Sequence, residues 1–347
     1  MVRAGLGPRW RCLFANDFDV KKSRTYRENW GDGELKTRDV ASLTTRDLPG
    51  EANLAWASFP CQDLSLAGDG AGLQGHRSSA FWPFWRLIQG LNNEDRAPRI
   101  LVLENVCGAL TSRGGKDFAV ILDALRQAGY RAGAIVADAA LFVPQSRPRL
   151  FVIAVHGDSE IPRDCIADGP SSTWHRKITP PLSQRDWIWW NPPLPPQRTT
   201  SFSDLVEANP GDVEWFSKEY TRQLLAKMSD INYVKLQTAK REKRRVVGAL
   251  YRRTRQGIQR AEIRFDGLSG CLRTPAGGSS RQIILVVDGP SVRARLISRR
   301  ETARLMGLPD TYALPENYNE AYHLTGDGVV VPVVRHLAEH IFEPVAA

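Results

Sequence analysis

The sequence is poor in cysteine and has none of the spacings that would join cysteines into a structural site. Its five cysteines in 347 residues are an odd, scattered set without a Cys-x-x-Cys pair, so neither a disulfide framework nor a zinc knuckle is indicated. The N-terminus lacks the apolar core of a signal peptide, and no stretch reaches the roughly 18 uninterrupted apolar residues of a membrane span. These absences predict a soluble, cytoplasmic protein without a bound metal or a membrane partner.

Basic residues are in excess. The chain has 47 Lys and Arg against 38 Asp and Glu, which gives a formal net charge of +9. Clustered cations gain affinity for phosphates by displacing counterions, so a polyanionic partner is favoured, although charge alone does not name it. The hydrophobic content of 42% supports a core for one large α/β domain with an inserted lobe, or for two ordinary domains.

Short apolar runs alternate with amphipathic stretches from residue 10 to about residue 155, as in repeated strand–helix–strand units. The expected strands are 11–15, 54–59, 100–103 and 150–155, and the expected helices are 81–91 and 118–128. The second helix ends before Gly129, a residue type that commonly follows helices. This rhythm predicts a parallel sheet covered by helices.

The texture changes near residue 157, where we expect a first domain boundary. Pro180-Pro181 and the run 191–196, Asn-Pro-Pro-Leu-Pro-Pro, cannot continue a helix or a strand ladder. The segment from Lys235 to Arg260 then carries ten Lys or Arg against one acid, Glu242. The inserted lobe is therefore the basic part of the chain. The tryptophans at 187, 189 and 190, which precede the basic stretch, are interpreted as hydrophobic packing.

Ordered α/β texture returns beyond about residue 290. Ser298 followed by Glu301 predicts a capping box, and 333–342 an apolar C-terminal helix. The sequence contains no internal repeat. We therefore expect a main α/β domain built from 1–157 and 291–347, with the basic lobe inserted at 158–290.

Three reactive groups lie next to expected strands. Cys61 comes after an apolar run and a proline, Glu104 ends a fully apolar run, and Arg147 and Arg149 alternate just before another strand. Strand ends in open α/β sheets face the ligand crevice, so these groups suggest one shared site. Taken singly, each group also has a purely structural interpretation. Cys61 could be a buried structural cysteine, Glu104 a helix cap, and the two arginines part of a solvated strand edge.

In this order and spacing, Pro60-Cys61-Gln62, Glu104-Asn105-Val106 and Gln145-x-Arg147-x-Arg149 resemble motifs of the cytosine carbon-5 DNA methyltransferase family. The run 295–309 resembles the helix that this family has after its recognition lobe, and 326–332 resembles its last motif. The resemblance covers nearly the whole chain apart from the middle lobe. It implies the Rossmann-like α/β sheet of S-adenosylmethionine-dependent methyltransferases, with 158–290 as an inserted, smaller target-recognition domain and both flanking parts as the catalytic domain.

The chemistry of the family explains these residue types. Carbon 5 of cytosine is a poor nucleophile, so a group must first add to carbon 6, and a cysteine thiolate suits an adduct that later collapses. By resemblance, Cys61 is this nucleophile and Glu104 binds and protonates ring nitrogen 3. Arg147 and Arg149 contact a cytosine that has swung out of the duplex, and Gln145 supports their loop. The implied substrate-binding residues are Gln62, Ser65, Asn105, Gln145, Arg273, Gly277 and Gly278.

The methyl donor implied by the resemblance is S-adenosylmethionine. Asp17 follows the expected strand 11–15, and an acid at a strand end is well placed to hold ribose hydroxyls. Phe18 would pack on the adenine, and Asp39 with Val40 would read its amino edge. Taken alone, these acids fit turn or helix caps equally well. The implied cofactor residues are Asp17, Phe18, Asp39, Val40, Pro60, Asp327 and Gly328.

In the inserted lobe, we expect Lys240–Arg260 to neutralise phosphates and the glycine-rich stretch 269–281 to approach base edges. The bland alternative for the basic stretch is a charged, solvent-exposed helix. Asp327 stands where the family commonly has Asn, and Cys271 where it commonly has Thr.

One family motif is absent. A strand ending in Phe-x-Gly-x-Gly should precede the helix expected at 2–6, and Gly5-Leu6-Gly7 does not supply it because no strand comes before these glycines. We therefore expect the sequence to be truncated at its N-terminus, with the first strand and part of the cofactor floor missing.

Three other functions stay open at this point. One branch of the family methylates transfer RNA through the same cysteine, although the long recognition lobe favours duplex DNA. A truncated chain could persist as a catalytically impaired DNA-binding remnant. A thiol hydrolase would need a histidine paired with an acid near Cys61, and His76 lacks that acid. The resemblance further implies a monomeric bacterial or phage protein at the nucleoid, with a cognate restriction endonuclease as a candidate partner.

Overall fold

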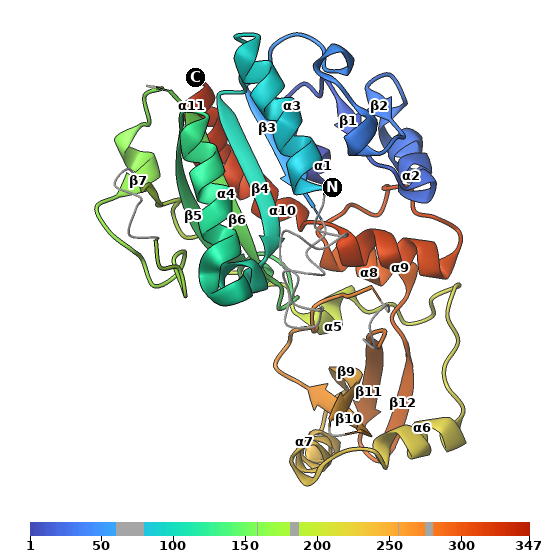
Figure 1. Ribbon diagram of the computed structural model, residues 1–347. Helices are drawn as coiled ribbons and strands as arrows, with labels where there is room; N and C mark the ends of the chain where they lie inside the picture. Colours follow the sequence, from blue (N-terminus) through green and yellow to red (C-terminus); the bar gives the residue numbers. More distant parts are fainter. Residues whose placement is uncertain (60–79, 158, 181–186, 256, 275–279) are drawn as a thin grey trace. The chain divides into compact units, whose positions relative to one another are not determined.

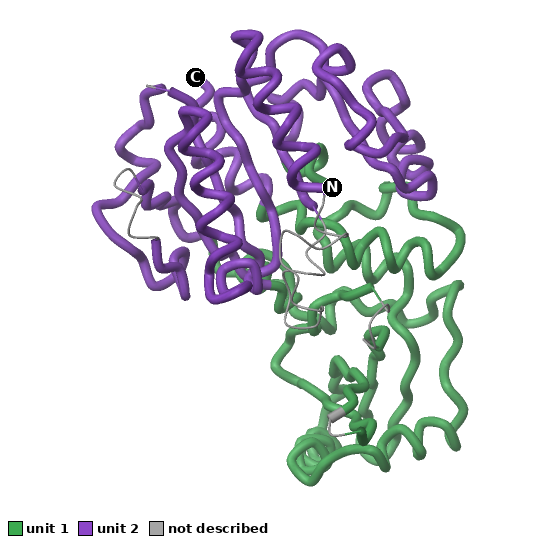
Figure 2. Tube along the Cα trace, viewed as in Figure 1, with its two compact units in different colours: residues 1–5, 139–147, 195–333 green, residues 6–138, 148–194, 334–347 purple. Residues whose placement is uncertain are grey.

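The structure, a computed structural model, describes residues 1–347 except 60–79, 158, 181–186, 256 and 275–279. The chain divides into two compact units, each assembled from separate stretches of sequence (Figure 2). Unit 1 comprises residues 1–5, 139–147 and 195–333, and unit 2 comprises residues 6–138, 148–194 and 334–347. Within the described residues, every helix is too short or too polar to span a bilayer. The domain division at residues 157 and 290 stays a prediction.

The centre of unit 2 is a four-stranded sheet in the order β3-β4-β6-β5 (Figure 1). Its strands are β3 (Leu54–Ser58), β4 (Ile100–Val106), β5 (Tyr130–Asp138) and β6 (Pro148–His156). β3 and β4 are parallel, as predicted, whereas β6 runs antiparallel to both β4 and β5. The sheet is therefore mixed, and the prediction of a parallel sheet is wrong for this half. The stretch 139–147 that joins β5 to β6 is too short for the crossover that parallel neighbours need.

Helices cover both faces of this sheet. α3 (Phe81–Asn93) and α4 (Lys116–Gln127) lie within two residues of their predicted bounds and pack on one face, where Leu103 and Leu122 belong to the buried core. On the other face, the C-terminal π-helical turn (Ala338–Phe342) and α11 (Glu343–Ala346) follow one another, and the ring of Phe342 lies 6.2 Å from that of Trp56. Burial on both faces explains why β4 begins as a fully apolar run.

The two edges of the sheet differ. Along β5, the N–H of Ile188 donates to Ala132 O at 3.0 Å and the N–H of Val136 donates to Trp174 O at 2.7 Å, so the segment after β6 covers this edge. Trp190 is fully buried nearby and donates its ring N–H to a β6 carbonyl at 3.0 Å, which agrees with its interpretation as packing. Along β3, the described residues add no further strand, and its side chains are half-buried or exposed.

Unit 2 also contains a parallel pair of short strands, β1 (Ala15–Asn16) and β2 (Leu35–Lys36). β1 lies at the end of the predicted strand 11–15 and is much shorter. α2 (Val20–Trp30) follows β1, and the carboxylate of Asp19 caps it by accepting from two backbone N–H groups. The predicted N-terminal truncation stays a prediction.

Unit 1 contains an antiparallel sheet in the order β10-β9-β11-β12. Its strands are β9 (Val246–Arg255), β10 (Ile258–Arg264), β11 (Ile283–Asp288) and β12 (Ser291–Leu296). α6 (Lys218–Leu225) and α7 (Asp230–Arg241) cover one face, where Leu250, Ile263 and Leu285 are buried with Leu224 and Leu236. We call residues 218–296 the β9–β12 lobe.

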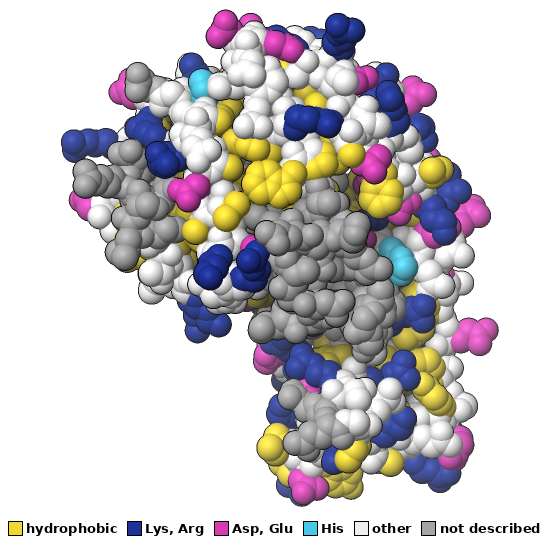
Figure 3. Space-filling view, viewed as in Figure 1, with side chains coloured by type: hydrophobic (Ala, Val, Ile, Leu, Met, Phe, Trp, Pro, Cys, Tyr) yellow, Lys and Arg dark blue, Asp and Glu magenta, His cyan; other side chains and the backbone are white. Residues whose placement is uncertain are grey.

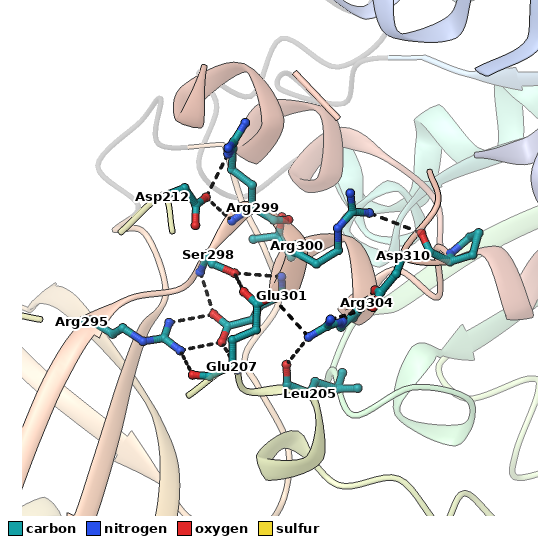
Figure 4. A network of polar contacts seen from close by, with 12 residues as sticks. Leu205, Glu207, Asp212, Arg295, Ser298, Arg299, Arg300, Glu301, Arg304 and Asp310 are labelled. Atoms are coloured by element: carbon teal, nitrogen blue, oxygen red, sulfur yellow. Dashed lines mark hydrogen bonds and ion pairs between the residues drawn. The ribbon is translucent and has the colours of Figure 1, made fainter. Parts of the chain in front are cut away.

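A buried ion pair joins β12, the last strand of this lobe, to α8 (Arg299–Leu305) (Figure 4). Arg295 and Glu301 are 0% and 1% exposed and make two charged hydrogen bonds, of 2.6 and 2.8 Å. Arg295 also donates to the carbonyl of Glu207 at 2.7 Å, and Glu301 accepts from the N–H groups of Glu207 and Ser298, both at 2.7 Å. The predicted capping box at Ser298 is confirmed, and its carboxylate is also the partner of Arg295.

Removal of one partner of this pair should be costly because it leaves the other charge buried and alone. Arg295→Met is expected to lower the free energy of unfolding by about 3–5 kcal/mol, measured by urea unfolding followed by circular dichroism. The double change Arg295→Met with Glu301→Leu should cost less than the single one.

Arg304→Met is the matched control for this prediction. Arg304 pairs with Asp310 at 2.7 Å, but the two side chains are 26% and 60% exposed, so the change should cost at most about 1 kcal/mol. Equal losses for Arg295→Met and Arg304→Met would contradict the prediction.

Candidate functional site

The ends of β4 and β6 bring two of the predicted catalytic side chains together. In the antiparallel register Glu104 lies opposite Phe151 and Val106 opposite Arg149, so Glu104 and Arg149 share one face of the sheet. Arg149 Nε lies 3.3 Å from Glu104 Oε1, and the two side chains are 16% and 8% exposed. A charged pair so withdrawn from water interacts more strongly than one on the surface.

The strand that leads to Cys61 lies beside this pair. Ser58, the last residue of β3, pairs directly with Glu104 in the parallel register. Cys61 itself lies outside the described residues, and so do five other predicted site residues: Pro60, Gln62, Ser65, Gly277 and Gly278. Their roles stay predictions.

Asn105 projects from the opposite face of β4, the face that carries Leu103. Its Oδ1 accepts from the N–H of Val106 at 2.8 Å, whereas its Nδ2 is buried and has no hydrogen-bond partner among the described residues. Leaving such a donor unpaired costs about 1–3 kcal/mol. Asn105 is thus not grouped with Glu104 and Arg149, and its contact with substrate stays a prediction.

A second thiol, to which the sequence reasoning gave no role, lies just after β4. Cys107 begins a 3-10 turn (Cys107–Leu110), and burial raises the pKa of its thiol, an effect that nearby Arg149 opposes. A thiol whose pKa is raised carries little thiolate at neutral pH and is a poor nucleophile. The environment of Cys107 therefore gives it no catalytic character.

Arg147 is buried in unit 1 and holds neighbouring main-chain segments together. It is 2% exposed, and its guanidinium donates to the carbonyls of Leu272, Gly326 and Gly328 at 2.6 to 2.8 Å. The sequence predicts that Arg147 contacts the target cytosine together with Arg149. In the structure the two arginines have different surroundings, and Arg147 links the segment at Leu272 to the segment at Gly326 and Gly328. Its contact with the cytosine stays a prediction.

Gln145 is also a bracing residue. It is fully buried, its Nε2 donates to Leu305 O at 2.8 Å, and its Oε1 accepts from the N–H of Leu272 at 3.0 Å. The neighbouring backbone N–H of Ser146 donates to Ser269 O at 3.0 Å. These contacts hold the loop that precedes Arg149. The contact of Gln145 with substrate stays a prediction.

The carboxyl ends of β1 and β2 bring the first predicted cofactor residues to one edge. Asp17 Oδ1 accepts from the N–H of Asp19, and Asp39 Oδ1 accepts from the N–H of Ala41, both at 2.8 Å, so both acids do form local turns. Phe18 is 73% exposed. An exposed aromatic ring beside two carboxylates at parallel strand ends fits an adenine and its ribose.

Asp327 and Gly328 lie in unit 1, at the end of α9 (Tyr318–Asp327). The hydroxyl of Thr274 donates to Asp327 Oδ1. A Cβ added to Gly326 would lie 3.1 Å from Thr274 N, so the backbone around exposed Arg273 packs tightly against this helix end. Thr274 was missed because a lone threonine in a loop carries no motif.

The chain matches known proteins over most of its length. It is 27% identical over 332 residues to the type II methyltransferase M.NlaX of Neisseria lactamica, covering 95% of this chain and 88% of that protein. It is 25% identical over 353 residues to M.HpaII of Haemophilus parainfluenzae, covering 96% and 83%. S. pombe Dnmt2 methyltransferase has a similar fold, with a TM-score of 0.60 and 18% identity over 96% of this chain and 91% of that one. A family model described as C-5 cytosine-specific DNA methylase matches residues 3–343, and the chain therefore belongs to this family, which methylates carbon 5 of cytosine in DNA.

Proposed function

We propose that the chain methylates cytosine in duplex DNA through a covalent adduct with Cys61, and that Glu104 and Arg149 hold and activate the base. The observation that carries the proposal is the pairing of Glu104 with Arg149 at 3.3 Å, one strand away from the segment that leads to Cys61. A carboxyl and a guanidinium side by side suit the cytosine edge, which presents an amino group, a ring nitrogen and a carbonyl.

Glu104 accounts for the activation of the ring. When a thiolate adds to carbon 6, negative charge moves through the ring toward nitrogen 3, and a carboxyl that donates a proton there neutralises it. Arg149 holds the carboxyl through its Nε. Its other N–H groups extend the recognition to the carbonyl oxygen of the base.

Cys61 supplies the nucleophile. Its thiolate forms a bond to carbon 6, and the electron pair of the carbon 5–carbon 6 double bond becomes available at carbon 5, which takes the methyl group. A base then removes the proton from carbon 5, the double bond re-forms, the thiolate leaves, and nitrogen 3 returns its proton to Glu104. Because the faces of a base are stacked in a duplex, the cytosine has to swing out first, at a cost of a few kcal/mol.

S-adenosylmethionine, when bound, supplies an electrophilic methyl group. In our proposal Phe18 packs on its adenine, Asp17 holds the ribose hydroxyls, and Asp39 with Val40 binds the amino edge. Pro60, Asp327 and Gly328 complete the proposed set. Arg147 and Gln145 act as positioning residues, because their contacts brace the loop that precedes Arg149.

The names of M.NlaX and M.HpaII as type II methyltransferases support a cytoplasmic role in a restriction-modification system, with a cognate endonuclease as partner. The family description, C-5 cytosine-specific DNA methylase, favours DNA over transfer RNA as the substrate.

Covalent trapping tests the nucleophile. With S-adenosylmethionine, a long duplex carrying 5-fluorocytosine at every cytosine should form an adduct that survives a denaturing gel, because fluorine cannot leave carbon 5 as a proton does. Cys61→Ser should form none, and the matched control Cys107→Ser should form it as the parent does. An adduct with Cys61→Ser, or none with the parent, would refute the proposal. A 5-fluorocytidine transfer RNA trapped instead of the duplex would assign the RNA substrate.

The two neighbouring arginines should separate in a rate and stability comparison. Arg149→Lys is expected to lower the rate of methyl transfer roughly 10²-fold with little loss of stability, because it removes the contact with Glu104 but keeps the charge. Arg147→Lys is expected to lower the free energy of unfolding by about 1–3 kcal/mol, because buried carbonyls lose their donors. Initial rates of methyl transfer and urea unfolding of both variants measure the two effects. A large loss of rate in Arg147→Lys, with the loss of stability in Arg149→Lys, would assign the base contact to Arg147.

A further inference from the structure

The basic residues of the β9–β12 lobe form two clusters at opposite ends of β9. The turn cluster, which includes Lys243 and Arg245, lies between α7 and β9, and the hairpin cluster, which includes Arg253 and Arg260, lies where β9 and β10 pair alone. The strand advances eight residues from Arg245 to Arg253, roughly 26 Å. Lys and Arg side chains are spread over the surface of this lobe (Figure 3), so surface charge alone does not separate the clusters.

The hairpin cluster lies beside the stretch 269–281 that the sequence predicts to approach base edges. Ser280 Oγ accepts from the N–H of Arg252 at 2.8 Å and donates to Arg252 O at 3.0 Å. A Cβ added to Gly270 would lie 3.8 Å from Tyr251 Cδ1. Two residues of this stretch, Gly270 and Ser280, therefore lie against the end of β9 from which the hairpin extends.

The turn cluster has different neighbours. It leads into Val246, which pairs with Val287, one residue before the end of β11. This end of the sheet is remote from Ser280 and Gly270. Lys243 and Arg245 are exposed and have no ion-pair partner among the described residues.

The positions of Arg253 and Arg260 lower the stability of the protein when no ligand is bound. They lie directly opposite each other in the antiparallel register and share a face of the sheet, and like charges in such positions destabilise the strand pair. Arg253 is partly compensated, because its Nε lies 3.5 Å from Glu262 and its guanidinium 4.6 Å over the Tyr251 ring. Arg260 is exposed and has no partner among the residues described. A bound anion would turn this repulsion into attraction.

We propose that Arg253 and Arg260 bind backbone phosphates of the DNA next to the stretch 269–281, and that the turn cluster at Lys243 and Arg245 does not touch the DNA. This inference rests on the proposed DNA substrate. It assigns DNA binding to only one part of the basic stretch Lys240–Arg260, whereas the sequence analysis predicts that the whole stretch neutralises phosphates. Each phosphate neutralised by a protein cation adds about 0.9 to the slope of log affinity against log salt concentration.

The test compares two double variants with equal charge loss. The full chain is titrated into a fluorescein-labelled duplex of mixed sequence at several KCl concentrations, and binding is followed by fluorescence anisotropy. Arg253→Ala with Arg260→Ala should lower the salt slope by about 2 and weaken binding on the order of tenfold for each contact at ~0.1 M salt. Lys243→Ala with Arg245→Ala should leave the slope unchanged.

Arg253→Lys with Arg260→Lys should retain most of the salt slope, since the charges remain, and circular dichroism should show that all variants are folded. An unchanged slope in the arginine pair, or an equal fall in the control pair, would overturn the inference. The outcome is separable from the proposed function. If the parent binds duplex through this pair but forms no 5-fluorocytosine adduct, the catalytic proposal fails and the binding surface stands. If the parent forms the adduct but the double arginine variant keeps the parent's salt slope, the catalytic proposal stands and the proposed binding surface fails.

Discussion

The antiparallel register between β4 and β6 is the constraint on which the candidate site depends. It sets Glu104 and Arg149 on one face of the sheet, and a slip by one residue would turn Arg149 to the other face. The register is held by apolar side chains buried on both faces, among them Leu103 opposite Val152 on one face and Val102 opposite Ile153 on the other. The core of unit 2 therefore fixes which face of the sheet carries the pair.

Local signals in the sequence predicted local structure well. Helical spacing located α3 and α4 within two residues, and Ser298 with Glu301 marked the start of α8, because these patterns depend on neighbours along the chain. Strand direction was harder. Whether β6 runs parallel or antiparallel to β4 depends on which strands pair and on a short connection, and neither is visible in an apolar run.

The same limit applies to the site. Family motifs singled out Glu104, Arg147 and Arg149, but the motif spacing does not say which arginine pairs with the carboxylate. The pleat alone would turn both arginines to one face. They differ because β6 begins at Pro148, so Arg149 lies in the strand beside Glu104, whereas Arg147 lies in the loop before it and donates to the carbonyls of Gly326 and Gly328. Thr274 and the buried Nδ2 of Asn105 were invisible for a similar reason, since their environments come from distant segments.

Burial divides the arginines of this chain by role. Arg147 and Arg295 are buried and donate to carbonyls or to a buried carboxylate, so the loss of either guanidinium would leave buried acceptors without a donor. Arg253 and Arg260 keep exposed charges at a position where they repel each other, which is tolerable in a free protein and useful when an anion is near. The formal charge of +9 is thus not a measure of the DNA-binding surface. In our proposal, the cations that bind DNA are the two that the register of β9 and β10 places opposite each other.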